Sequence, residues 1–266
     1  MRIGNKDFDF DKEAYIMGIL NVTPDSFSDG GRFNSVDEAL KQAEKMIEEG
    51  AHIIDIGGES TRPSHDKVEI DEEISRVVPV IEALRKRYDV PVSIDTSKSR
   101  VAEAALDVGA DMINDVWGFK RDEYIAGVAR DFNVPCCLMH NRVKSGYVNL
   151  MEEVLDEMGE SVQIALDAGV SSEKIMIDPG IGFAKTPEEN LIVMKNLEMF
   201  GRFGLPVLLG TSRKSMIGYA LDLPVGERLE GTIATTVFGY MKGCRIFRVH
   251  DVKENLRALR MVQAMS

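Results

Sequence analysis

YIMGILNVTPDSFSDGGRFNSVDEALKQAEKMIEEGAHIIDIG spans residues 15–57 and carries the pattern that decides the fold. An apolar run (15–20) is followed by a polar loop (21–34), a segment with helical periodicity (35–50) and a second apolar run (51–57). Short apolar runs rich in β-branched residues predict buried parallel strands, and the segment between them predicts a helical crossover. This stretch therefore predicts one β-α-β unit.

The same alternation continues along the chain. Eight such units favour a closed (β/α)8 TIM barrel of the α/β class, expected as a single domain over residues 1–266, with an open doubly wound sheet as the alternative. Beyond the two runs above, the predicted strands are PVSID (91–95), DMIN (111–114), PCCLMH (135–140), KIMID (174–178), PVLLG (206–210) and CRIFRV (244–249). The predicted helices span 35–50, 73–87, 98–109, 122–132, 149–169, 186–200, 227–243 and 252–265.

Several predicted helices carry recognisable ends. Ser35 precedes an acidic first turn, and Thr186 is followed by Pro187 at the first helical position. Glycines are expected to end four helices because they adopt the left-handed conformation at little cost. They are Gly50, Gly109, Gly169 and Gly243.

Composition and charge argue against several kinds of binding partner and several locations in the cell. A formal charge of −12 argues against a nucleic-acid partner, which needs a basic face. No apolar stretch is long enough to span a membrane, and the charged N-terminal residues lack a signal-peptide pattern, so we expect a cytoplasmic protein with no membrane partner. The three cysteines lack disulfide or metal spacing and are interpreted as buried packing residues, as are Trp117 and most methionines.

Polar residues recur where the predicted strands end. The loops after the strands of a TIM barrel build its active site. One Asp or Asn at such a position is ordinary, because these residues cap helices and start turns, but recurrence at every strand predicts a single polar mouth. The residues are Asn21, Asp55, Glu59, Thr61, Arg62, Asp95, Thr96, Asn114, Asp115, His140, Asp178, Arg213, Lys214, Arg248, His250 and Asp251.

These residue types suit a particular ligand chemistry. Buried carboxylates and amides match a flat heterocycle rich in N–H groups, whereas guanidinium and imidazole groups match phosphate. GTSRKS (210–215) is typical of an anion cradle before a helix, although a helix cap with a solvated Arg-Lys pair is the alternative. The long loops 21–34 and 57–71 are expected to act as lids.

Seven motifs, in order along nearly the whole chain, resemble the dihydropteroate synthase family of pterin-binding TIM barrels. They are MGILNVTPDSFSDGG (17–31), GGESTRP (57–63), SIDTSK (93–98), NDVWG (114–118), DPGIGFAKT (178–186), GTSRKS (210–215) and RVHDV (248–252). The first two are the most specific. NRVKSGY (141–147) departs from the Gly-Thr-Pro-type segment of many members, so the family's loop shape is not carried over there.

The resemblance implies a transferase of folate biosynthesis. It would condense 6-hydroxymethyl-7,8-dihydropterin pyrophosphate, bound with Mg²⁺, with p-aminobenzoate and release pyrophosphate. Sulfonamides would be competitive mimics, and the chain would form a homodimer through late helices near residues 231–243.

The resemblance also implies residue roles. The pterin edge would contact Asp95, Asn114, Asp178 and Lys214, with Arg248 stacked on the ring. Pyrophosphate would lie against Asn21, Thr61, Arg248 and His250, with Asn21 near Mg²⁺. The p-aminobenzoate ring would pack beside Thr61, Arg62, Pro63, Phe183 and Lys214, and its carboxylate would meet the helix that opens at Ser215.

The expected reaction is displacement of pyrophosphate by the neutral amine at the pterin methylene carbon. Fixed charge then matters more than a general base: Asp95 would face the developing cation, while Mg²⁺, Arg248 and His250 would stabilise the leaving group. Asp95, Lys214, Arg248 and His250 are thus the expected catalytic residues. The pterin ester is expected to bind first and complete the p-aminobenzoate site.

Other functions are open at this point. Lys214 could form a Schiff base, as lysines do in barrel aldolases, but its turn is more typical of an anion or carbonyl partner. A methyltetrahydrofolate-dependent corrinoid methyltransferase would share the pterin-binding acids, yet it gives no reason for the pairing of Arg248 with His250. A non-catalytic pterin carrier is the third alternative.

Overall fold

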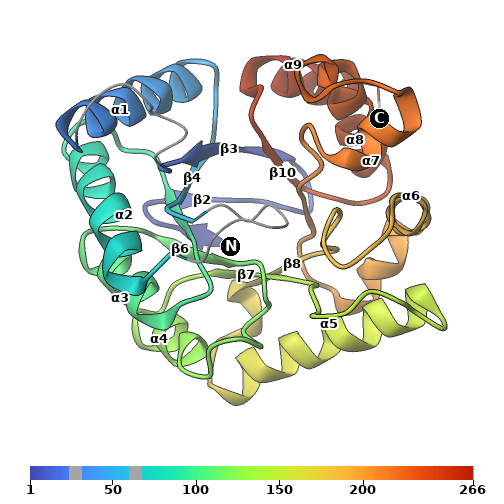
Figure 1. Cartoon of the computed structure of the whole chain (residues 1–266), viewed down its shortest axis with the longest axis horizontal. Coiled ribbons are helices and arrows are strands. Elements are labelled where there is room, and N and C mark those ends of the chain that lie inside the picture. The colour runs from blue at the N-terminus through green and yellow to red at the C-terminus, as the bar shows by residue number, and fades with distance from the viewer. Residues whose placement is uncertain (24–31, 60–67, 266) are drawn as a thin grey trace.

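The computed structural model describes residues 1–23, 32–59 and 68–265, and these form a closed barrel of parallel strands ringed by helices (Figure 1). The strand order is β8-β7-β6-β5-β4-β3-β10-β9, and a parallel bridge between Ile177 and Val207 joins the two edges. The barrel prediction is therefore confirmed. Its strands are β3 (Tyr15–Asn21), β4 (Ile53–Gly57), β5 (Val92–Asp95), β6 (Met112–Asp115), β7 (Cys136–Met139), β8 (Ile175–Asp178), β9 (Leu208–Leu209) and β10 (Ile246–Val249).

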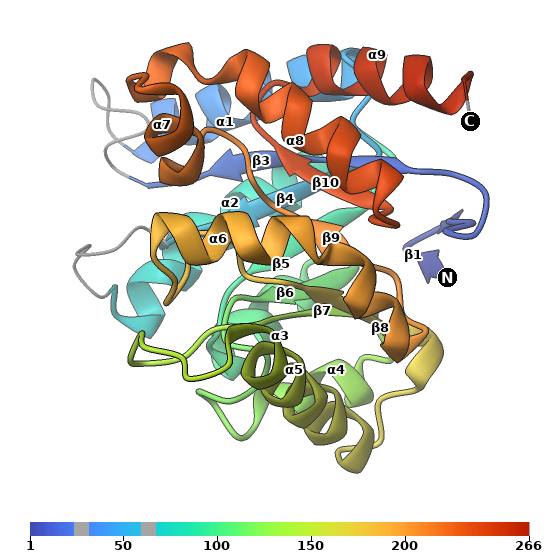
Figure 2. The same cartoon turned by 90° about the vertical axis from the view of Figure 1, so that its right-hand side faces the viewer.

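Helices cover the outside of the barrel (Figures 1 and 2). In α2, Val77, Val80, Ile81 and Leu84 are fully buried at the spacing of one helix face, so burial of apolar surface against the strands holds the helix in place. The bounds are α1 (Arg32–Glu48), α2 (Ile70–Arg85), α3 (Ser99–Asp107), α4 (Ile125–Asp131), α5 (Leu150–Asp167), α6 (Pro187–Lys195), α7 (Ser215–Leu221), α8 (Leu229–Met241) and α9 (Val252–Gln263).

Some of the predicted helix ends are confirmed and others are wrong. Thr186 forms a full capping box with Glu189, and the four predicted glycines all have positive φ. The predicted start of the first helix at Ser35 is wrong, because α1 already begins at Arg32. The predicted helix 186–200 is also shorter, since α6 stops at Lys195 and a 3₁₀ segment (Leu197–Phe203) follows.

An unpredicted hairpin closes the amino end of the barrel. β1 (Arg2–Ile3) and β2 (Lys6–Asp7) pair antiparallel. They lie beside the end of the barrel at which β3 begins (Figure 2). Ile3 and Phe8 are buried against inward-facing strand residues such as Met17, Met112 and Met176. Because this end is filled with apolar side chains, the carboxyl ends of the strands are left as the polar mouth.

One prediction from composition, the burial of the three cysteines, is confirmed. Cys136, Cys137 and Cys244 are buried and free. Throughout the described ranges, no helix combines the length and apolar character needed to cross a membrane.

Candidate functional site

Arg248 on β10 joins two acidic residues from neighbouring strands. Its Nε donates to Asp55 Oδ2 at 2.6 Å and its Nη2 to Asp95 Oδ2 at 2.6 Å. The Asn114 amide donates to the same Asp55 oxygen at 3.2 Å. Burial by itself would lower the pKa of Arg248, but the two carboxylates raise it above its usual value. The predicted meeting of Asp95, Asn114 and Arg248 is therefore present.

The acids beside Arg248 each keep an open acceptor. Asp55 Oδ1 and Asp95 Oδ1 are buried and have no hydrogen-bond partner among the residues that the structure describes. Burial raises the pKa of Asp95 to about 7, although the nearby Arg248 charge opposes this shift. Buried acceptors without partners are rare in folded proteins, so these two oxygens are available to donors that the described residues do not supply.

Gly210, directly after β9, brings a second group of predicted residues together. A methyl group on Gly210 would lie 3.7 Å from Asp178 Oδ2, 3.9 Å from Lys214 Nζ and 3.9 Å from Arg248 Cβ. Burial raises the pKa of Asp178, against the effect of the Lys214 charge, and burial lowers the pKa of Lys214 to about 8. Lys214 is thus mostly protonated at pH 7 and can donate hydrogen bonds.

Phe183 and Ser215 flank Lys214. The Lys214 ammonium donates to the Ile181 carbonyl and lies 4.8 Å from the centroid of the Phe183 ring. Ser215, the first residue of α7, is exposed. The predicted neighbourhood of Lys214, Phe183 and Ser215 is therefore present, whereas their contact with a ligand stays a prediction.

Asn21 and His250 lie at the ends of adjoining strands β3 and β10. A methyl group on Gly57 would lie 3.8 Å from Asn21 Oδ1 and 3.6 Å from Asp95 Oδ2, which places Asn21 beside the acidic group. The His250 ring shares a 2.9 Å hydrogen bond through Nδ1 with Ser212 Oγ. Thr61, Arg62 and Pro63, also predicted here, lie outside the described residues.

Some polar residues at the strand ends serve the fold instead. Asp115 accepts from the Trp117 and Phe119 amides at 2.9 and 2.7 Å, which shapes the turn after β6. Arg213 pairs with Asp251, so its charge is already balanced. Trp117 is half-buried with Arg121 5.3 Å from its ring, so its assignment to the core is wrong.

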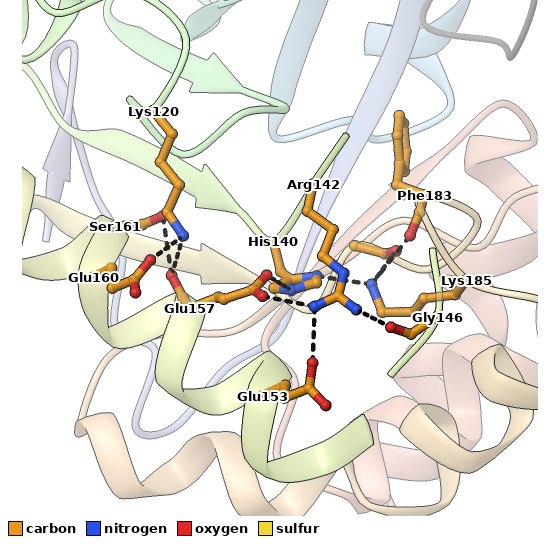
Figure 3. A network of polar contacts seen from close by, with 11 residues as sticks. Lys120, His140, Arg142, Gly146, Glu153, Glu157, Glu160, Ser161, Phe183 and Lys185 are labelled. Carbon is orange, nitrogen blue, oxygen red and sulfur yellow. Dashed lines mark hydrogen bonds and ion pairs between the residues drawn. The ribbon is translucent and has the colours of Figure 1, made fainter. Parts of the chain in front are cut away.

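His140 belongs to a network that sequence reasoning missed (Figure 3). Its Nε2 lies 2.9 Å from Glu157 Oε2 and its Nδ1 lies 2.9 Å from Lys185 Nζ. Burial lowers the pKa of His140 to about 2 and that of Lys185 to about 7. The placement of His140 after a strand predicted the mouth, but only three-dimensional packing reveals its partners on α5 and before α6.

A second missed cluster lies beside the described end of β4. Lys98 Nζ donates to Glu59 Oε2 at 2.5 Å, to Glu73 Oε2 at 2.6 Å and to the Val68 carbonyl at 2.6 Å. Lys98 therefore links residues on both sides of segment 60–67 to α2. The SIDTSK motif contains this lysine, but nothing in the motif identifies its partners.

Comparisons with known proteins place this geometry in context. A family model described as "Pterin binding enzyme" matches residues 17–250. A dihydropteroate synthase of Clostridium beijerinckii is 60% identical over 98% of this chain and 97% of its own length. A Clostridium difficile dihydropteroate synthase structure, solved in the presence of pteroic acid, has a TM-score of 0.95 at 52% identity, covering 97% of this chain and 99% of that one. A Xanthomonas albilineans dihydropteroate synthase structure with 4-aminobenzoic acid has a TM-score of 0.92 at 39% identity, covering 95% and 93%.

Proposed function

The chain belongs to the dihydropteroate synthase family of pterin binding enzymes, and from this premise we propose how its residues divide the work. The activity is transfer of a dihydropterin group: 6-hydroxymethyl-7,8-dihydropterin pyrophosphate is joined to p-aminobenzoate, and pyrophosphate leaves. Assignment of roles to individual residues, of Mg²⁺ and of the assembly is our proposal.

The observation that carries the proposal is the pair of open acceptors beside Arg248. A pterin presents ring N–H and amino donors along one edge, and these would satisfy Asp55 Oδ1 and Asp95 Oδ1. Asn114, Asp178 and Lys214 would complete the edge with an amide, an acceptor and a donor. The Arg248 guanidinium, planar and held by two carboxylates, would stack on the ring.

The leaving group would lie toward Asn21 and His250. Mg²⁺ keeps most of its ligands as water and phosphate oxygens and needs only one or two from protein, so the Asn21 amide oxygen beside Asp95 fits the ion. A group of three or more acidic, His or Cys ligands is absent from the described residues, which agrees with a metal held mainly by substrate. When bound, Mg²⁺ supplies positive charge to the departing pyrophosphate. Thr61 stays part of this proposal.

The acceptor would lie on the Phe183 side of Lys214. The Phe183 ring offers an apolar face, and the exposed opening of α7 at Ser215 offers polar groups for a carboxylate. Arg62, Pro63 and Thr61 are proposed to complete the contact with the p-aminobenzoate ring. Sulfonamides, which share the shape of the aminobenzoate, would compete here.

Charge placement accounts for the chemistry. The amine nitrogen of p-aminobenzoate is neutral at pH 7, so its lone pair can attack the methylene carbon without a strong base, and the nitrogen of the new C–N bond then releases its extra proton to water. As the C–O bond breaks, positive charge spreads into the pterin beside Asp95, and negative charge collects on pyrophosphate near Arg248 and His250. Groups fixed by the fold stabilise both changes without reorganisation.

Release of pyrophosphate tests the proposed function. The unmodified chain, given the pterin ester, p-aminobenzoate and Mg²⁺, should release pyrophosphate and form dihydropteroate in equal amounts. A chain that binds the ester without turnover would be a carrier, and methyl transfer to a corrinoid would identify the methyltransferase alternative. Either result contradicts the proposal.

Assembly and location remain proposals. Exposed apolar side chains on the late helices, including Tyr219, Leu221, Phe238 and Met241, support a homodimer through this side. Light scattering should give twice the chain mass of 29.5 kDa, and a monomer mass at micromolar concentration would contradict the homodimer. The cytoplasm is the proposed location.

A further inference from the structure

The His140 ring has one protonation pattern that satisfies both neighbours. An ionised Glu157 carboxylate only accepts, so His140 Nε2 must carry the proton that it donates across 2.9 Å. Nδ1 is then an acceptor, and the Lys185 ammonium donates to it across 2.9 Å. Arg142 Nη1 holds Glu157 from the other side at 2.8 Å. The imidazole is thus a fixed bridge between α5 and Lys185 (Figure 3).

In its protonated form, Lys185 donates its three ammonium protons to three acceptors. Besides His140 Nδ1, it donates to the Gly180 carbonyl at 3.0 Å and to the Phe183 carbonyl at 3.2 Å. Both carbonyls belong to the loop 179–184 between β8 and α6. The Lys185 side chain therefore connects two carbonyls of this loop, through His140, to Glu157 on α5.

The loop contains one non-glycine residue in an unfavourable backbone conformation. Gly180, Gly182 and Ala184 all have positive φ, and Ala184 adopts 50° despite its Cβ. A methyl group on Gly180 would lie 1.9 Å from the His140 carbonyl oxygen, so the loop rests directly on the His140 backbone. Asn190 Oδ1 supports the loop once more by accepting from the Gly182 amide at 2.7 Å.

The same loop contributes to the acceptor side of the proposed site. The Ile181 carbonyl accepts from Lys214, and the Phe183 ring faces the Lys214 ammonium. Asp178 is on barrel strand β8, although its carboxylate also accepts from the Gly180 amide of the loop at 2.7 Å, whereas Asp95 and Arg248 are on other strands and bind each other. A change in loop shape would move Phe183 and the Lys214 partner more than Asp95 and Arg248.

We propose that Lys185 is a positioning residue which, through His140 and Glu157, holds loop 179–184 in the shape that receives p-aminobenzoate. It touches no reacting atom, so its loss should weaken acceptor binding and leave the chemical step nearly intact. This inference rests on the proposed function, since it concerns the acceptor of that reaction.

The test is a set of steady-state measurements on Lys185→Met, which keeps length and removes the donors. We expect KM for p-aminobenzoate to rise about tenfold, as for loss of one charge-assisted hydrogen bond at a binding surface. KM for the pterin ester and kcat should stay within about threefold, because Asp95 and Arg248 are held to each other on barrel strands. Lys195→Met, the same change on an exposed lysine at the end of α6, should leave all three constants unchanged.

Thermal unfolding of each variant separates positioning from general damage. An unchanged p-aminobenzoate KM in folded Lys185→Met overturns the inference, and so does an equal loss in both KM values and kcat. If Lys185→Met does not fold, Lys185→Gln serves instead, because its shorter neutral amide cannot reach all three acceptors. It should raise the same KM at least about threefold, and a normal value overturns the inference. If the unmodified chain does not release pyrophosphate, the proposed function is contradicted, and so is this inference, which rests on it.

Discussion

Asp95 combines a buried carboxylate, one hydrogen bond from Arg248 and one open oxygen. Its environment decides its charge, because burial raises its pKa to about 7 while Arg248 acts in the opposite direction. Near neutral pH a small change in conditions therefore changes the fraction of enzyme with an ionised Asp95. That fraction matters only if the carboxylate faces developing positive charge, as proposed.

We predict that kcat/KM for the pterin ester falls as pH drops through about 7, because Asp95 then gains a proton and loses its charge. Asp95→Asn should lose this acidic limb and lower kcat/KM about 100-fold at pH 8. Rate measurements from pH 5.5 to 9 check both, with Lys195→Met as the control. If the Asp95→Asn enzyme keeps the acidic limb of the pH profile or the full rate, Asp95 has no role in the reaction.

Loop 179–184 is the element in which backbone strain and site geometry coincide. Gly180 combines positive φ with close contact to the His140 carbonyl, so both backbone strain and steric overlap oppose a side chain there. Gly204 has a similar φ of 62° but open space around it. A side chain at Gly204 would therefore meet backbone strain without steric overlap.

Gly180→Ala should therefore lower the free energy of unfolding by about 3 kcal/mol, and Gly204→Ala by about 1 kcal/mol. Urea unfolding of the two variants and the unmodified chain measures the difference. If the two substitutions lower the free energy of unfolding equally, the loop can move away from the His140 carbonyl without loss of stability. The positioning role proposed for Lys185 would then lose its support.

Elements differ in how far the sequence predicts them. The eight strands and the polar residues after them followed from apolar runs, because each run is one buried strand with its own turn signal. Helix α7 had no predicted range, but the GTSRKS motif and the family resemblance indicated a helix that opens at Ser215, and α7 begins there. The N-terminal hairpin was missed because two-residue strands carry no alternation, although Ile3 and Phe8 fill the barrel end.

The site was predictable in outline and not in its pairings. Strand ends alone indicated a shared mouth for Asp95, Asp178 and Arg248. Nothing in the sequence tells that Arg213 is neutralised by Asp251, or that His140 turns toward α5 and Lys185. Such pairings depend on distances between loops, which residue order does not contain.

At the scale of the whole molecule, binding order follows from how the site is divided. The proposed pterin contacts lie on the barrel strands and at their ends, whereas Phe183, proposed for the acceptor, lies in the loop between β8 and α6. That residues 1–266 make up one domain stays a prediction.

We predict an ordered reaction in which p-aminobenzoate binds only after the pterin ester, or after pyrophosphate with Mg²⁺. Calorimetric titration of p-aminobenzoate should give no measurable heat of binding to the chain alone and clear binding once pyrophosphate and Mg²⁺ are present. Tight binding to the chain alone would argue for independent sites.

Residues from separate strands are proposed to form one pocket for the pterin ring. A crystal structure of the chain with the pterin pyrophosphate and Mg²⁺ tests this proposal most directly. The ring edge should contact Asp95, Asn114, Asp178 and Lys214, with its face on Arg248 and the phosphates toward Asn21 and His250. A pterin ordered elsewhere, with Asp55 and Asp95 still lacking partners, would contradict the account.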